Sequence, residues 1–130
     1  MVVGAHAMAV HGVPRATGDL DVWIEPTAEN AERIWRALAT FGAPLDSLGI
    51  ALEDFVRPDM VVELGLPPRR IDLMTGITGV SFPGAWAEMI MVSVEGREIP
   101  FLGRRALTEN KRATGRPKDL SDLDSLPPET

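Results

Sequence analysis

The chain of 130 residues contains no cysteine and no tyrosine, and aromatic residues make up only 5% of it. Without cysteine, the protein has no disulfide, no Cys-ligated zinc or iron–sulfur centre and no thiol nucleophile. Basic residues are also few, because 13 Lys and Arg stand against 19 Asp and Glu, which gives a net charge of −6. This balance excludes a protein that binds duplex DNA or RNA mainly through a broad basic surface, although it allows a local basic pocket.

Long hydrophobic runs are lacking as well. The longest apolar stretch near the start, Met1 to Val10, is interrupted by His6 and has no basic region before it. It therefore fits neither a signal peptide nor a membrane-spanning helix, and we expect no membrane association and a cytoplasmic location. Apolar residues make up 45% and charged residues 25% of the chain, which are ordinary globular proportions. We expect a single domain, residues 1–130, with one hydrophobic core.

The first half of the chain predicts short strands that alternate with helices. Val2-Val3 before Gly4 is typical of the end of a buried strand, and residues 5–10 of a short helix. Residues 19–24 alternate polar and apolar side chains, as a strand with one buried face does. A helix is expected from Thr27, which can cap it, to Gly42. Residues 43–58 show no clean period, and we expect a loop with a short helix there.

The second half predicts two pairs of strands and a helical end. The strands are expected at residues 60–64, 70–74, 90–94 and 97–101, with a short helix at 82–89 before the second pair. Residues 104–126 have a helical composition that is broken at Gly115-Arg116-Pro117. Their Lys and Arg side chains make them a basic helical segment of the same domain.

Two carboxylates, Asp19 and Asp21, form the strongest local signal. Two residues apart on a strand, they point to the same face with alpha carbons roughly 6.6 Å apart. Two unpaired acids on one face repel each other, and a divalent cation such as Mg²⁺ between them relieves the repulsion. Asp72 lies between apolar neighbours on another expected strand and can supply a third ligand. The alternative is that these acids only form a solvated strand face.

Gly4 and Ala5 lie at a junction between strand and helix, where unpaired amides and the helix dipole attract an anion. Gly4 would let a phosphate come close, although glycine at such a junction also serves simply as a turn residue. The planar guanidinium group of Arg15 can bind phosphate oxygens, or Arg15 can be a surface residue of the loop. Thr17 is expected foremost to form the turn before Asp19.

These residues resemble the minimal nucleotidyltransferases of the DNA polymerase beta-like superfamily. The pattern is an apolar residue, a glycine and a small residue, then about a dozen residues, then two acids that alternate with apolar residues, and later a lone acid on a strand. Residues 12–21 and 110–123 are most similar to small bacterial nucleotidyltransferases of the abortive-infection toxin type. Family members usually have Gly or Ser at the position of Ala5. An N-terminal helix is common in related folds, so either the natural start lies upstream of Met1 or that helix is absent.

The resemblance implies a role for each matching residue. Gly4 and Ala5 would hold a nucleoside triphosphate, Asp19 and Asp21 would bind Mg²⁺, and Asp72 would complete the site or act as base for the incoming hydroxyl. The remaining nucleotide-binding candidates are Arg15, Thr17, Lys111 and Lys118. For the two lysines, a solvated helix face is the alternative. We expect Asp119 and Asp122 to pair with the basic residues around them.

The sequence therefore predicts an α+β fold, a small mixed sheet with the three acids on one face and helices covering the other. The expected reaction is Mg²⁺-dependent transfer of a nucleoside monophosphate from a nucleoside triphosphate to an acceptor hydroxyl. The acceptor could be an RNA end, a protein hydroxyl or a small molecule. A catalytically silent nucleotide- or partner-binding module, such as one half of a toxin–antitoxin pair, is the alternative. We also expect a free sheet edge beside Met1, where a second copy or a partner chain could add.

Overall fold

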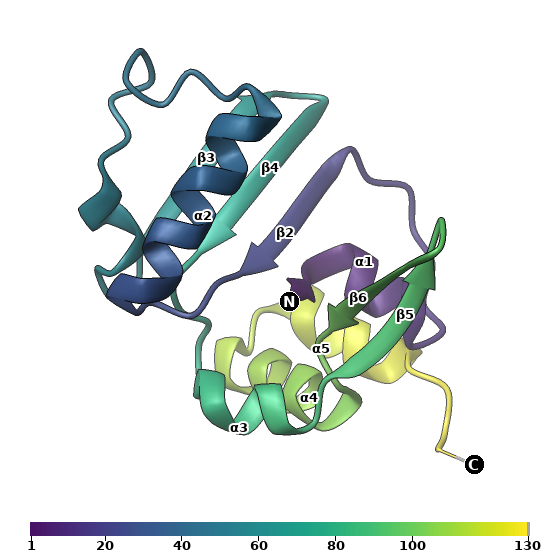
Figure 1. Ribbon diagram of the computed structural model, residues 1–130. Coiled ribbons are helices and arrows are strands. Elements are labelled where there is room, and N and C mark those ends of the chain that lie inside the picture. The colour runs from purple at the N-terminus through teal and green to yellow at the C-terminus, as the bar shows by residue number, and fades with distance from the viewer. Residues whose placement is uncertain (130) are drawn as a thin grey trace.

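A computed structural model describes residues 1–129 and shows a mixed α+β fold (Figure 1). The strands are β1 (Val2–Val3), β2 (Asp19–Trp23), β3 (Val61–Leu66), β4 (Arg69–Met74), β5 (Ile90–Val94) and β6 (Arg97–Phe101). The helices are α1 (Gly4–Val10), α2 (Ala28–Phe41), α3 (Phe82–Ala87), α4 (Arg104–Thr114) and α5 (Pro117–Ser125), and a 3₁₀ turn, η1, spans Leu52–Phe55. The strands and helices expected from the sequence are present, with bounds that differ by at most two residues.

The six strands form one sheet in the order β3-β4-β2-β1-β6-β5. β2 pairs in parallel with β4 and antiparallel with β1, while β1 and β6 run parallel. The hairpins β3–β4 and β5–β6 occupy the two ends of the sheet. β1 lies between β2 and β6, so the free sheet edge expected beside Met1 is wrong, because both sides of that strand are already paired. The mixed sheet expected from the sequence is therefore confirmed, and the parallel pair β2–β4 brings the two acid-bearing strands side by side.

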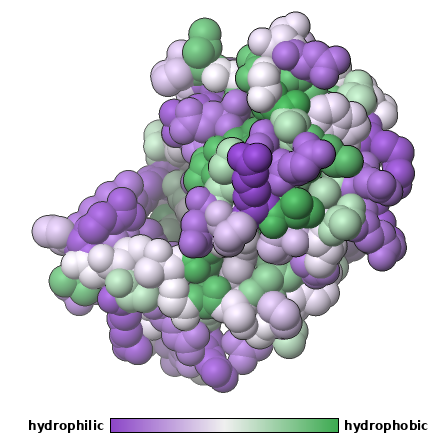
Figure 2. All heavy atoms as spheres, turned by 90° about the vertical axis from the view of Figure 1, so that its left-hand side faces the viewer, coloured by the Kyte–Doolittle hydropathy of each residue, from purple (hydrophilic) through white to green (hydrophobic). Residues whose placement is uncertain are grey.

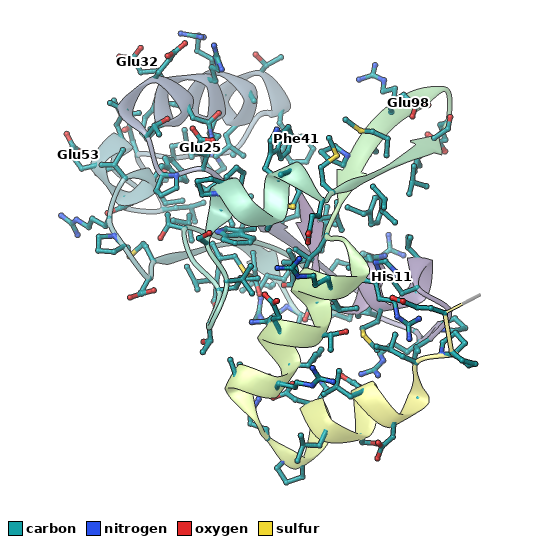
Figure 3. The ribbon with its side chains drawn as sticks, turned by 90° about the horizontal axis from the view of Figure 1, so that it is seen from below. His11, Glu25, Glu32, Phe41, Glu53 and Glu98 are labelled. Atoms are coloured by element: carbon teal, nitrogen blue, oxygen red, sulfur yellow. The ribbon has the colours of Figure 1, made fainter. Side chains whose placement is uncertain are left out.

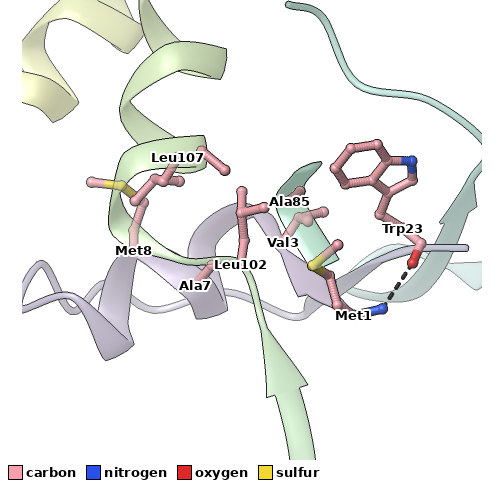
Figure 4. Close-up of a cluster of buried hydrophobic side chains, with 9 residues drawn as sticks. Met1, Val3, Ala7, Met8, Trp23, Ala85, Leu102 and Leu107 are labelled. Atoms are coloured by element: carbon pink, nitrogen blue, oxygen red, sulfur yellow. Dashed lines mark hydrogen bonds between the residues drawn. The ribbon is translucent and has the colours of Figure 1, made fainter. Parts of the chain in front are cut away.

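Hydrophobic residues pack on both faces of this sheet. Trp23 of β2 belongs to a cluster with residues of α1, α3 and α4, which Figure 4 shows in close-up. The neighbouring Val22 packs instead into a second cluster, which includes Ala31 of α2 and Phe55 of η1. Because successive side chains of a strand point to opposite faces, the two clusters lie on opposite sides. Helices thus cover part of each face, whereas we expected them on one.

The helix α2 ends where the sequence predicted. The Thr27 side chain accepts a hydrogen bond from the Asn30 amide at 3.2 Å, and Gly42 ends the helix with φ of 95°. Its apolar stripe packs over the β3–β4 part of the sheet, and Glu32 points away from it toward solvent (Figure 3). On the side of the molecule that carries α2, hydrophilic side chains predominate, with hydrophobic ones between them (Figure 2).

Two further observations complete the fold. The His11 ring Nε2–H donates to the Leu102 carbonyl at 2.8 Å, which ties the end of α1 to the start of α4. Among residues 1–129, no helix combines the length and the apolar character needed to cross a membrane.

Candidate functional site

Carboxylates from three neighbouring strands line up across one face of the sheet. Asp21 of β2 is the register partner of Asp72 of β4, and Asp72 is in turn the partner of Glu63 of β3. Side chains of register partners share a face, so these three residues form a continuous acid row. Asp19 lies on the same face two residues before Asp21, next to Arg70 in the register. The expected placement of Asp72 beside the strand of Asp19 and Asp21 is thus observed.

Asp21 lies at the centre of this row. Burial raises the pKa of its carboxyl, and the charge of Asp72 and a hydrogen bond between the two carboxyl groups raise it further. Asp19 contributes a smaller upward shift, and Arg70 opposes the shift. These causes describe two acids held so close together that one resists ionisation while the other is charged. A cation near Asp21 and Asp72 would relieve this repulsion.

Gly4 provides the space that Asp21 occupies. A Cβ atom at Gly4 would lie only 2.1 Å from Asp21 Oδ2, and the φ of Gly4 is +68°. Both observations require glycine, because other residues rarely adopt this backbone conformation. The close approach that Gly4 permits in this structure is therefore that of the Asp21 carboxylate, which brings the start of α1 and the acid row together.

Arg70 is the cation that contacts the acids in this structure. Its Nε and Nη2 atoms donate to the two oxygens of Asp72 at 2.7 and 3.0 Å. Its Nη2 atom also lies 3.9 Å from Asp19 Oδ2. The planar guanidinium group thus holds Asp72 through both oxygens, the strongest geometry that an arginine and a carboxylate form.

The carboxylates fit Mg²⁺ in chemical kind and partly in arrangement. Mg²⁺ takes oxygen ligands and is usually held by one or two carboxylates together with phosphate oxygens of a substrate. Asp21 and Asp72 supply such a pair. No three His, Cys, Asp or Glu side chains of residues 1–129 gather closely enough to hold a metal ion.

The basic candidates lie in a second group of charges, between the loop after α1 and the last two helices. Arg15 and Lys111 both pair with Asp122, Lys111 through a contact of 2.9 Å. Lys111 also lies 3.5 Å from Asp119, which accepts from Arg116 at 2.7 Å. We name these five residues the α5 ion cluster. The expected pairing of the two acids with basic residues is confirmed.

The two acids of the α5 ion cluster are buried, and both are held ionised. A hydrogen bond from Arg116 is the main reason that the pKa of Asp119 lies well below its usual range. Burial alone would raise the pKa of Asp122, but hydrogen bonds from Lys111 and Arg15 lower it below the ordinary value. Buried acids are stable when they are paired in this way. The cluster therefore attaches Arg15, four residues before Asp19, to α4 and α5.

The other expected nucleotide-binding residues have simpler surroundings. The Thr17 hydroxyl accepts a hydrogen bond from the Asp19 amide at 3.1 Å, so Thr17 forms the turn that leads into β2, as expected. Lys118 is exposed in the first turn of α5, and Ala5 lies in the first turn of α1.

Sequence reasoning missed Glu63 and Arg70. The strand of each residue was expected. Glu63 lies between apolar neighbours, whereas Arg70 follows Arg69 and precedes Ile71. Their relation to the acids depends, however, on the pairing register of β3, β4 and β2, which local patterns do not specify. A polar residue two positions before Asp72 was the signal for Arg70, because residues i and i+2 of a strand share a face.

Comparison with solved structures relates the whole arrangement to a known fold. The structure of TM1012 from Thermotoga maritima, a protein provisionally described as a nucleotidyltransferase, matches 97% of this chain and 78% of its own with a TM-score of 0.56. The chain has a nucleotidyltransferase-like fold. The two sequences are only 19% identical, so the likeness concerns the fold. No protein-family model and no curated protein matches the chain.

Proposed function

We propose that this nucleotidyltransferase-like chain transfers a nucleoside monophosphate from a nucleoside triphosphate to an acceptor hydroxyl. The observation that carries the proposal is the close pair Asp21–Asp72 on parallel strands, beside the glycine that begins α1. A fold shared with TM1012 supports it. The reaction class comes from the shared fold, and the acid pair agrees with it, because adjacent carboxylates suit a divalent cation that carries a triphosphate.

Each residue has a proposed task in this reaction. Asp21 and Asp72, with Asp19 as an additional ligand, would hold Mg²⁺, which when bound neutralises charge on the triphosphate oxygens. The acceptor oxygen attacks the α-phosphorus and the bond to the leaving pyrophosphate breaks. The hydroxyl proton passes to Asp72 if this carboxylate acts as the base instead of completing the metal site, and otherwise to solvent water. Amides of Gly4 and Ala5 would bind phosphate oxygens, because the start of α1 has amides without helical partners.

The basic residues have a more distant proposed role. Arg15 and Lys111 would contribute positive potential on the triphosphate side, with Thr17 and Lys118 as further contacts. Asp122 already pairs with both Arg15 and Lys111. A nucleotide would therefore have to compete with Asp122 or bind to those N–H groups of Arg15 and Lys111 that do not contact it. We therefore expect a smaller effect on nucleotide binding from Lys111 than from Asp21.

A catalytically silent binding module is the second candidate. One observation favours it, namely that the acids of residues 1–129 do not gather into a group of three around a metal site. Such a module would keep the fold and bind a nucleotide or a partner chain, as one half of a toxin–antitoxin pair would. A cytoplasmic location and assembly with a second copy or a partner belong to both candidates.

Calorimetry separates the two candidates. The enzyme needs both Mg²⁺ and a nucleoside triphosphate, and Asp21→Asn should abolish the Mg²⁺-dependent part of nucleotide binding. A silent module binds nucleotide equally well with Mg²⁺ or a chelator present, and Asp21→Asn leaves that binding intact. Incubation with labelled nucleoside triphosphates and a cell extract then identifies the acceptor by the RNA, protein or small-molecule fraction that carries the label.

A further inference from the structure

Arg70 holds a position that a metal ion would otherwise share. It lies on the same face as Asp72, two residues away on β4, and beside Asp19 in the register. Its side chain is 28% exposed, whereas that of Asp72 is 11% exposed. The guanidinium group is thus partly covered and held against the acids, with three contacts of 2.7, 3.0 and 3.9 Å.

The charges around Arg70 explain why it stays there. Four carboxylates, from Glu63, Asp72, Asp21 and Asp19, share this face on adjacent strands. Without a cation their mutual repulsion would destabilise the sheet at this point. Arg70 is the basic side chain that pairs with Asp19 and Asp72 within residues 1–129, so it offsets part of the negative charge of the row when no metal ion is bound.

The same contacts oppose a divalent cation. Mg²⁺ approaches a carboxylate oxygen to about 2.1 Å, and both oxygens of Asp72 already accept from Arg70. A guanidinium group and a divalent cation on one half-buried carboxylate would also repel each other strongly, because the water that screens charges is partly excluded.

We propose that Arg70 is an internal counter-cation that regulates the acid site by competing with the metal ion for Asp72. This inference rests on the proposed function, since it assumes that the acids take a divalent cation. In the metal-free protein the guanidinium group holds Asp72 and lies near Asp19. Metal binding requires Arg70 to release Asp72. The released guanidinium group can then pair with phosphate oxygens of the nucleotide, because its planar set of N–H donors suits phosphate as well as carboxylate.

The test compares Arg70→Gln with Arg69→Gln, with Mn²⁺ as the probe of divalent binding. Arg69 is exposed and adjacent on the same strand, so its side chain faces the other side of the sheet. The two variants lose the same charge, and only Arg70→Gln removes the contacts with the acids. Calorimetry measures Mn²⁺ affinity, and thermal unfolding measures Tm with a chelator and with Mn²⁺.

We expect Arg70→Gln to bind Mn²⁺ about tenfold more tightly than the wild type, and Arg69→Gln to differ from it by less than about twofold, which reflects long-range charge alone. With a chelator, Arg70→Gln should have a lower Tm than the wild type, and Mn²⁺ should raise its Tm more, because ligand binding stabilises the folded state in proportion to affinity. Arg70→Lys keeps the charge without the fork and should give an intermediate affinity, which retains the test if Arg70→Gln folds poorly.

Other results overturn the inference in distinguishable ways. If Asp21→Asn abolishes Mn²⁺ binding while Arg70→Gln binds no more tightly than Arg69→Gln, the metal site stands and the competition by Arg70 is wrong. Weaker binding by both Arg70 variants would make Arg70 a residue that orients the acids for the metal. If neither the wild type nor Arg70→Gln binds Mn²⁺, both the inference and the metal site of the proposed function fail.

Discussion

Single residues at the acid row combine stabilising and destabilising roles. Asp21 is half-buried next to another carboxylate, and its pKa is raised by burial and by Asp72. A carboxyl whose pKa is higher in the folded than in the unfolded state binds its proton more tightly when folded. Stability therefore falls as the pH rises from about 4, the ordinary value of aspartate, through the raised pKa. At neutral pH the ionised carboxylate of Asp21 therefore destabilises the folded state, as is often the case at sites that bind charged ligands.

Asp21→Asn should consequently raise Tm at pH 7 in the presence of a chelator. The substitution keeps the shape of the side chain and removes the charge that Asp72 repels. The measurement is Tm between pH 4 and pH 8, where the gain should grow as the pH rises. Asp19→Asn is the control, because its side chain is 43% exposed and contributes less to the repulsion. A lower Tm for Asp21→Asn at pH 7 would mean that the charge of Asp21 stabilises the fold.

Gly4→Ala should destabilise the protein through two separate effects. The positive φ costs about 1–2 kcal/mol for an L-residue, and the new methyl group would also collide with the Asp21 carboxylate. We expect the free energy of unfolding to fall by about 3 kcal/mol or more in urea denaturation. Gly49→Ala is a matched control, since Gly49 has φ of +70° with nothing within 4 Å of the added Cβ. The free energy of unfolding that Gly49→Ala loses should correspond to the backbone effect alone.

A second background separates the collision from the backbone strain. In Asp21→Ala the obstructing carboxylate is gone and only the Cβ of residue 21, at 3.1 Å, stays close. Gly4→Ala should therefore cost much less in that background than in the wild type, and only slightly more than Gly49→Ala costs. An undiminished cost in that background would place the collision elsewhere. This result also bears on the nucleotide, because a substitution at Gly4 that displaces Asp21 would weaken metal and phosphate binding together.

At the scale of elements, the sequence predicted what is local and missed what depends on pairing. Alternation in residues 19–24 predicted that Asp19 and Asp21 share a face, and Thr27 with Gly42 predicted the limits of α2. Arg15 and Asp122, in contrast, lie 107 residues apart, and no local pattern indicates that they meet. The same holds for Glu63, whose place in the acid row follows from the register of three strands.

The helix α5 illustrates this limit clearly. Its leucines at positions 120, 123 and 126 are three apart and look like a buried stripe, yet Leu120 is 50% exposed. Asp119 and Asp122 are buried instead, because Arg15, Lys111 and Arg116 pair with them. Composition alone assigns carboxylates to the surface, so the buried face of α5 becomes apparent only from partners on other elements.

Lys111→Met should test how far the α5 ion cluster holds these helices in place. The lysine contacts both buried acids, and its loss leaves them to Arg15 and Arg116 alone. We expect the free energy of unfolding to fall by about 2 kcal/mol at pH 7, less than for a buried charge left without any partner. Lys118→Met, on the exposed side, should change it by no more than about 0.5 kcal/mol. Urea denaturation measures both.

The pH dependence gives this prediction a second readout. The lowered pKa values of Asp119 and Asp122 contribute stability above about pH 4, and this contribution is lost as the pH falls below it. Between pH 5 and pH 3 the wild type should therefore lose stability more steeply than Lys111→Met does. Equal slopes would show that Lys111 does not hold the acids ionised.

The whole molecule is organised around one sheet with a hydrophobic cluster on each face. β2 and β4 contribute alternate residues to both clusters, for example Trp23 to one and Val22 to the other. We therefore expect a change on one face to affect the other through the strands that carry the acids. If the chain is the one domain that the sequence predicts, the two clusters should unfold together as a single cooperative unit.

Tryptophans placed on either side make this expectation measurable. Trp23 belongs to the first cluster and Trp35 packs against the second, whereas Trp86 is 43% exposed. Trp35→Phe/Trp86→Phe leaves Trp23 as the reporter, and Trp23→Phe/Trp86→Phe leaves Trp35.

Leu107→Ala, which removes buried volume from the first cluster, should lower the free energy of unfolding by about 3 kcal/mol. In a cooperative domain both reporters register that loss equally in urea. A midpoint that shifts for Trp23 but not for Trp35 would divide the chain into two separately stable layers, and coupling between the faces through β2 and β4 would then be excluded.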